Sequence, residues 1–252
     1  MKNLPIRIIS RIDIKGENVI KGVHLEGLRV IGNPKSLALN YYDNGIDEII
    51  FMDVVASLYG RNNLFNVIKQ AAQNVFVPIT VGGGIRKLKD INLALRNGAD
   101  KIAINTAAIK NPAILKEASR MFGSQCIVLS IEAKRRNIGY WEVLTDNGRE
   151  KTNISVIDWI VEAEKLGVGE ILLTSVDQEG TQSEYDIELT EKVCSKVNIP
   201  IIACGGAGSV ESIESLLKNI RPSICISSLF HYKKYTPNSL KELLNKKGFY
   251  VR

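Results

Sequence analysis

The chain repeats itself at a fixed distance, and this repeat limits the folds open to it more than any other feature. Residues 77–84 (VPITVGGG) return as residues 199–206 (IPIIACGG), so that Gly84 aligns with Gly206, 122 residues later. Residues 47–53 (DEIIFMD) return as residues 169–175 (GEILLTS) at the same distance. Each copy is an apolar run that ends in glycine or a polar residue. The repeat therefore predicts a fold built from two similar halves.

Apolar runs of strand length alternate along the chain with segments that carry helix signals. Asn33-Pro34 opens one helix that should end near Gly45, and Asn111-Pro112 opens another that should end near Phe122. Apolar runs separated by helices are typical of βα units around a parallel sheet. The eight expected strands are residues 7–13, 48–54, 77–83, 101–105, 126–132, 170–176, 199–206 and 223–228.

Four βα units repeated twice predict an α/β fold, a (β/α)8 TIM barrel with an internal two-fold repeat, rather than an open doubly wound sheet. Residues 1–252 should form one domain, with half-barrels at approximately 1–122 and 123–252. Two segments interrupt the pattern. Residues 15–33 are too long for a plain turn and should form a flap over the site, and residues 140–151 should form a β-hairpin around Asp146-Asn147-Gly148.

Composition narrows the class of protein. Hydrophobic residues make up 45% of the chain and charged residues 24%, as in ordinary globular domains. The net charge is +6, but the basic residues are interleaved with acids, which disfavours nucleic-acid binding and suits a polyanionic small molecule. No long apolar segment or signal peptide is visible, so we expect a cytoplasmic protein with no membrane association. Without a CxxC pair, the cysteines should be free thiols: Cys126, Cys194, Cys204 and Cys225.

Glycine-rich turns end the third and seventh expected strands, as Gly82-Gly83-Gly84 and Gly205-Gly206. In a TIM barrel the carboxyl ends of the strands build the site. Without side chains, backbone N–H groups can approach a phosphate closely, and a helix N-terminus favours an anion. One such turn can be a plain tight turn, but two at equivalent positions predict a substrate phosphorylated at both ends. The expected substrate- and phosphate-binding residues are Lys21, Gly84, Asn105, Thr106, Ser175, Asp177, Gly180, Thr181, Gly205, Gly206, Ser227 and Ser228.

Two carboxylates, Asp13 and Glu132, end the first and fifth expected strands at equivalent positions. A protonated and an ionised carboxyl near a substrate can exchange protons with it, so both residues are candidate catalytic groups. The alternative is that they only pair with the nearby Lys15 and Lys134. His24 and His231 have no neighbouring ligands at metal spacing, so we expect neither a metal nor a cofactor.

Several strings place the chain near a known family: residues 13–15 (DIK) with 19–22 (VIKG), 81–85 (VGGGI), 104–108 (INTAA), 122–125 (FGSQ) and 205–208 (GGAG). Across essentially its whole length the chain resembles the cyclase subunits of imidazole glycerol phosphate synthase. The resemblance implies a lyase of histidine biosynthesis that uses ammonia to convert a phosphoribulosyl-formimino aminoimidazole carboxamide ribotide. Its products are imidazole glycerol phosphate and aminoimidazole carboxamide ribotide. Asp13 matches one catalytic carboxylate, whereas Glu132 stands where the family has an aspartate.

The resemblance also implies a glutaminase partner subunit that docks at the N-terminal face of the barrel and supplies ammonia. On this basis four residues would gate the ammonia, although they could be simple salt bridges: Arg7, Glu48, Lys101 and Glu170. One alternative function is a cyclase-like paralogue that passes ammonia to a sugar-amidating enzyme in surface-polysaccharide synthesis. A second is a sugar-phosphate isomerase acting alone, which would need neither partner nor gate.

Overall fold

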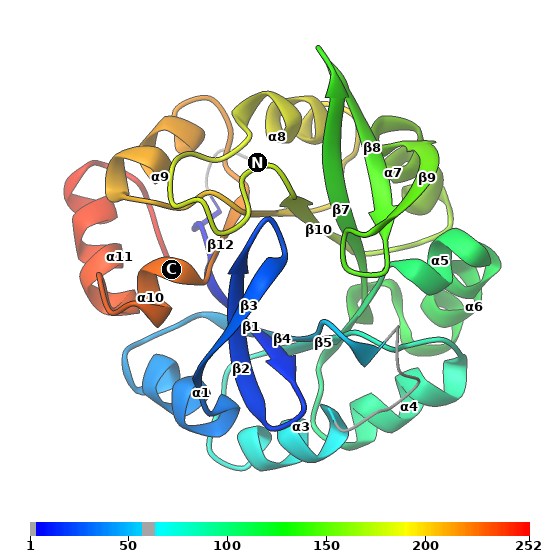
Figure 1. Ribbon diagram of the computed structural model, residues 1–252, viewed down its shortest axis with the longest axis horizontal. Coiled ribbons are helices and arrows are strands. Elements are labelled where there is room, and N and C mark those ends of the chain that lie inside the picture. Colours follow the sequence, from blue (N-terminus) through cyan, green and yellow to red (C-terminus); the bar gives the residue numbers. More distant parts are fainter. Residues whose placement is uncertain (1–3, 57–63) are drawn as a thin grey trace.

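A closed barrel of parallel strands forms the centre of the computed structural model, which describes residues 4–56 and 64–252 (Figure 1). The first strand, β1, pairs in parallel with both β4 and β12, which closes the sheet. Helices surround the barrel on the outside. The predicted TIM barrel is therefore confirmed. Its strands, in barrel order, are β1 (Ile8–Lys15), β4 (Glu48–Asp53), β5 (Ile79–Gly82), β6 (Lys101–Ile104), β7 (Ile127–Asn137), β10 (Glu170–Ser175), β11 (Ile201–Cys204) and β12 (Ser223–Ile226).

The outer helices begin and end close to the predicted signals. The Asn33 side chain accepts hydrogen bonds from the backbone N–H groups of Lys35 and Ser36, and Pro34 is the first helical residue of α1. None of the helices within the described ranges is long and apolar enough to cross a membrane. The helices are α1 (Pro34–Asp43), α3 (Leu64–Ala72), α4 (Leu88–Arg96), α5 (Thr106–Lys110), α6 (Ala113–Phe122), η1 (Ser124–Cys126), α7 (Val156–Lys165), α8 (Ile187–Cys194), α9 (Val210–Leu217), α10 (Ser228–His231) and α11 (Pro237–Lys246).

Antiparallel arms extend the first strand of each half. The predicted flap is a hairpin of β2 (Asn18–Val23) and β3 (Glu26–Gly32) that pairs with β1 and lies in front of the barrel centre in Figure 1. The second arm adds β8 (Tyr140–Thr145) and β9 (Glu150–Ser155) to β7. Because β7 keeps pairing with β8, it runs five residues past its predicted end at Glu132. The internal repeat therefore includes both arms.

Apolar side chains fill the barrel interior just above its N-terminal end. Side chains alternate along a strand, so a residue two positions after an inward-facing one also faces inward. Four buried residues follow the predicted gate residues in this way and belong to one hydrophobic cluster. We call Ile9, Ile50, Ala103 and Leu172 the apolar collar. A separate, larger core packs between the strands and the surrounding helices.

Candidate functional site

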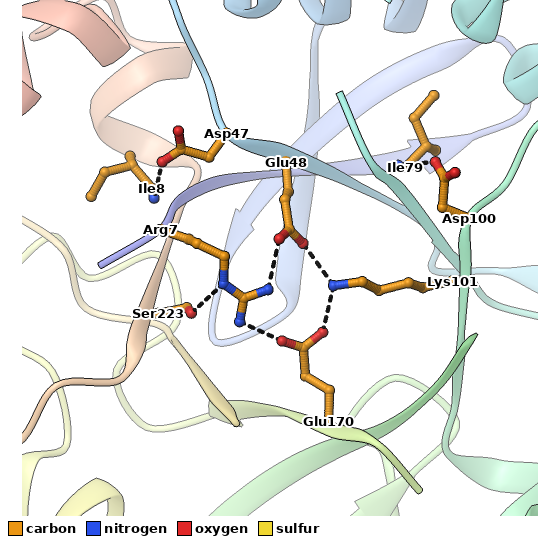
Figure 2. Close-up of polar contacts among 9 residues, drawn as sticks. All are labelled: Arg7, Ile8, Asp47, Glu48, Ile79, Asp100, Lys101, Glu170 and Ser223. Carbon is orange, nitrogen blue, oxygen red and sulfur yellow. Dashed lines mark hydrogen bonds and ion pairs between the residues drawn. The ribbon is translucent and has the colours of Figure 1, made fainter. Parts of the chain in front are cut away.

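The four predicted gate residues form one closed ring of ion pairs at the N-terminal end of the barrel (Figure 2). The guanidinium of Arg7 contacts Oε1 of Glu48 at 2.6 Å and Oε1 of Glu170 at 2.5 Å. Lys101 Nζ contacts Oε2 of the same two glutamates at 2.9 and 2.8 Å. Burial lowers the pKa of Arg7, but the two glutamates raise it, and the net shift is upward. Arg7 is therefore held charged at the N-terminal end of the barrel.

The first half-barrel has an open cavity of about 260 Å³ at the carboxyl ends of β4, β5, β6 and β7. The glycine turn after β5 lines it, and so do the first residues after β6. Two cations, Arg86 and Lys110, also line the cavity, which favours an anionic ligand. The predicted residues that meet here are Gly84, Asn105, Thr106 and Glu132.

The second half-barrel has a cavity of only about 10 Å³ at the equivalent place. This volume is close to the space that one water molecule needs. Lys21 reaches it from β2 and forms a buried ion pair with Glu179, whose carboxylate also faces the cavity. The predicted residues that meet here are Lys21, Gly180, Gly205, Gly206, Ser227 and Ser228.

The two glycine turns share one backbone geometry. Gly83 has φ 94° and Gly205 has φ 97°, a region that side chains rarely adopt. A Cβ at Gly83 would lie 2.1 Å from the carbonyl oxygen of Asp53, and one at Gly205 would lie 2.8 Å from that of Ser175. Asp53 and Ser175 are themselves equivalent residues of the repeat. Glycine is therefore required at both turns by the same close approach of two strands.

Asp13 lies inside the barrel near the carboxyl end of β1 and is 5% exposed. Its partner is not the expected one. Its Oδ1 accepts a hydrogen bond of 2.7 Å from Nε of Arg11, a side chain that is 1% exposed. Lys134, the lysine expected near Glu132, contacts Asp177 at 2.5 Å. The alternative paired Asp13 with Lys15 and Glu132 with Lys134. It is wrong, because Asp13 pairs with Arg11 and Lys134 pairs with Asp177.

Glu132 is the second buried carboxyl and lies at the edge of the first cavity. Burial raises its pKa to about 7, although Arg11, the backbone N–H of Gly148 and Asn105 each lower it. Nδ2 of Asn105 donates to Oε2 of Glu132 at 2.6 Å and to the carbonyl oxygen of Leu144 at 3.0 Å. A carboxyl with this pKa exchanges protons readily near neutral pH.

Asp13 and three of the predicted substrate-binding residues are not among the described residues that line either cavity. Ser175 Oγ is buried without a hydrogen-bond partner in the described part of the chain. Asp177 accepts hydrogen bonds from Lys134 and from the backbone N–H of Arg135. Thr181 Oγ1 donates to the carbonyl oxygen of Gln178 at 2.9 Å. Their contribution to substrate binding stays a prediction.

Both histidines make hydrogen bonds. Nδ1 of His24 lies 3.0 Å from the carbonyl oxygen of Val176, and Nδ1 of His231 lies 2.5 Å from the Tyr41 hydroxyl. Burial lowers the pKa of His231 to about 4, so this imidazole is neutral at physiological pH. In these hydrogen bonds neither histidine contacts Asp13 or Glu132.

The sequence analysis assigned no role to Arg11 or Glu179, although each contacts a predicted site residue. Arg11 stands two residues before Asp13, so strand alternation alone puts the two side chains on one side of β1. That spacing was the available signal. Glu179 meets Lys21 across 158 residues of chain, a contact that no local pattern reveals.

Comparison with known proteins agrees with this geometry. Residues 7–236 match the family described as "Histidine biosynthesis protein", which fits a barrel with two glycine turns and two carboxylates. Among curated relatives, a Legionella pneumophila protein is 62% identical over 206 residues, covering 82% of this chain and 97% of that protein. Relatives from Prochlorococcus marinus (strain MIT 9215) and Hydrogenobaculum sp. (strain Y04AAS1) are 46% and 45% identical, covering 98% of each chain. These relatives are named imidazole glycerol phosphate synthase subunit HisF, and the chain belongs to that family.

The match confirms the resemblance found in the sequence motifs. The relatives carry the name of the imidazole glycerol phosphate synthase subunit, so the polysaccharide paralogue is not favoured. The complete charged ring disfavours an isomerase that acts alone. The name of these relatives designates a subunit, which implies that they work in a complex.

Proposed function

We propose that this chain joins ammonia from a glutaminase partner to a phosphoribulosyl-formimino aminoimidazole carboxamide ribotide. The products are imidazole glycerol phosphate and aminoimidazole carboxamide ribotide. One observation carries the proposal: two glycine turns of matched backbone, at Gly83 and Gly205, stand in opposite halves of the barrel. A substrate with a phosphate at each end would use both turns and place its reacting centre between them.

The barrel order supports this placement of the reacting centre. β1 and β7 lie four strands apart in the ring of eight, and each stands beside one pair of phosphate-binding strands. Asp13 and Glu132 are at the carboxyl ends of these two strands, and the charge of Asp13 raises the pKa of Glu132. One carboxyl can take a proton from the incoming nitrogen while the other delivers a proton to the departing group.

Glu132 departs from the family's aspartate by one methylene, and its surroundings hold it in place. Asn105, at the end of β6, donates to one oxygen of Glu132, and the backbone N–H of Gly148 contributes a second hydrogen bond. Such support matters because a displacement of the order of 1 Å can lower a rate by about 10²-fold. We infer that the β8–β9 turn, which carries Gly148, compensates for the longer side chain.

The charged ring supports the second half of the proposal. It stands at the opposite end of the barrel from both cavities, where a glutaminase docked at the N-terminal face would deliver ammonia. Ammonia would then pass the ring and the apolar collar to reach the carboxylates. Arg7 and Lys101 each contact both glutamates, so opening the ring requires one cation to leave two anions.

The deciding experiment is to mix the purified chain with the ribulosyl ribotide and excess ammonium and to follow product formation. We expect turnover without the glutaminase, and no product from the folded wild-type chain would overturn the cyclase proposal.

Adding the glutaminase and glutamine tests the gate. In Lys101→Met, the ratio of glutamine-dependent to ammonium-dependent turnover should change. Lys241→Met, which removes a different, half-buried lysine paired with Asp47 at 2.6 Å, should leave that ratio unchanged.

A further inference from the structure

Arg11 is a buried cation inside the barrel that none of the roles described above requires. Its Nε donates to Asp13 Oδ1 at 2.7 Å, and its Nη1 donates to Thr174 Oγ1 at 3.0 Å. Thr174 stands on β10, which is three strands away from β1 around the barrel. The Arg11 side chain therefore spans a large part of the interior just below the two carboxylates.

The barrel itself does not demand an arginine at this place. The equivalent residue of the second half is Ser130, which stands two residues before Glu132 as Arg11 stands two before Asp13. Nη2 of Arg11 is buried with no hydrogen-bond partner within residues 4–56 and 64–252. Leaving a buried donor unpaired destabilises the fold, and more so when the donor is charged. A side chain that only filled space would not carry this penalty.

The Arg11 guanidinium acts on the two carboxyls unequally. It contacts Asp13 directly, whereas it lowers the pKa of Glu132 from a distance and is outweighed there by burial. Burial also lowers the pKa of Arg11 itself, but Asp13 and Glu179 raise it, and the net shift is upward. Arg11 is therefore a fixed positive charge. The other titratable groups that face this region are Lys21, Glu132, Glu179, Cys204, Cys225 and His231.

We propose that Arg11 is a positioning residue that gives the two carboxyls different tasks, an inference that rests on the proposed cyclase function. By its ion pair it keeps Asp13 as the anion that accepts a proton. Glu132, which forms no ion pair with any cation in the described part of the chain, is left as the carboxyl that donates one. Since His231 is neutral, it does not compete for either task. The pairing thus decides which face of the bound substrate receives a proton.

The test compares Arg11→Met and Arg11→Lys with a matched control, Arg136→Met. Arg136 also pairs through Nε with a buried glutamate, Glu142, but on the outer arm. In Arg11→Met, kcat should fall by about 10²-fold or more, because a general base contributes 10²–10⁴-fold, while KM should change by less than about threefold. The acid limb of the pH–rate profile should move to higher pH. Arg11→Lys should restore that limb, and the control should match the wild type.

A second readout needs no turnover. In protein labelled at aspartate side-chain carboxyl carbons, the Asp13 signal is the one that Asp13→Asn removes. It should move in Arg11→Met, because this variant removes the cation that contacts Asp13 Oδ1. If folded Arg11→Met keeps the wild-type kcat, acid limb and Asp13 signal, Arg11 has no positioning role. If Arg11→Met does not fold, Arg11→Lys provides the test, because the proposal expects this variant to keep the wild-type acid limb and Asp13 signal. A shift of both in Arg11→Lys would overturn the proposal.

The two readouts separate this inference from the proposed function. A wild-type chain that makes no product, yet shows the Asp13 signal responding to Arg11, would reject the cyclase proposal and retain the ion pair's effect on ionisation. A chain that makes product at a rate independent of Arg11 would retain the cyclase proposal and reject the positioning role of Arg11.

Discussion

The two half-barrels have the same backbone but unequal sites. Their glycine turns differ by only a few degrees in φ at Gly83 and Gly205, yet one cavity measures about 260 Å³ and the other about 10 Å³. The difference comes from side chains. Ser130 lines the larger cavity, whereas the ion pair of Lys21 and Glu179 lines the smaller one. Duplication has preserved what the backbone supplies, and the side chains around it have diverged.

Under the proposed function, this contrast would let a symmetric fold hold a substrate whose two ends differ. The first site is open, and Arg86 and Lys110 are among the residues that line it. The second is occupied by its own ion pair, so a phosphate entering there must displace Glu179 from Lys21. The second phosphate would thus bind together with a movement of the β2–β3 flap, which carries Lys21.

The largest expected effect is on catalysis, and it asks whether the two carboxyls are equally necessary. Asp13→Asn and Glu132→Gln should each lower ammonium-dependent kcat by about 10²–10⁴-fold, because each removes one proton-transfer group. Asp158→Asn, on the exposed side of α7, is the control and should retain the wild-type rate. Wild-type turnover in either site variant would end the acid–base assignment for that residue.

Glu132 should also make stability depend on pH. Its pKa rises from the usual 4.5 to about 7 on folding, so its contribution is complete below pH 4.5 and is lost as the pH rises through 7. The loss is about 3 kcal/mol of unfolding free energy. Urea unfolding of wild type and Glu132→Gln at several pH values measures it. The variant should lack this fall, and parallel curves would show that folding does not raise the pKa of Glu132.

The glycine turns should respond alike but not equally to alanine. Both substitutions force a side chain into a strained region, which lowers the unfolding free energy by about 1–3 kcal/mol. Gly83→Ala should lose more than Gly205→Ala, because the nearest oxygen would lie at 2.1 Å rather than 2.8 Å. Gly16→Ala isolates the backbone term, since a Cβ there meets nothing within 4 Å. Equal losses at all three positions would mean that the two strands yield easily.

The smallest effect concerns the closed second site. Glu179→Gln removes the carboxylate that competes with phosphate for Lys21, so inorganic phosphate should bind there more tightly, by up to about tenfold or 1.4 kcal/mol. Calorimetric titration with phosphate measures this, with the exposed Glu184→Gln as control. Weaker binding in Glu179→Gln would instead make Glu179 the residue that holds Lys21 in its binding position.

Features that recur or follow a local rule could be predicted from the sequence. The barrel, the matched turns and the Asp146 to Gly148 hairpin turn all have such signals, and the last shows positive φ at each residue. The extension of β7 could not, because residues 134–137 are charged and polar and resemble a loop until β8 pairs with them. The Lys21–Glu179 contact depends on the flap reaching across the barrel. Local patterns contain no information about such a meeting.

The apolar collar has a consequence for the form in which nitrogen could travel through the barrel. Ile9, Ile50, Ala103 and Leu172 offer no polar atom from their side chains, so an ion crossing this layer would lose its hydration without compensation, at a penalty of several kcal/mol or more. A small neutral molecule loses much less hydration free energy when it crosses the same layer. On the proposed route the barrel therefore discriminates by charge: ammonia can cross, whereas ammonium must first give up its proton on the ring side.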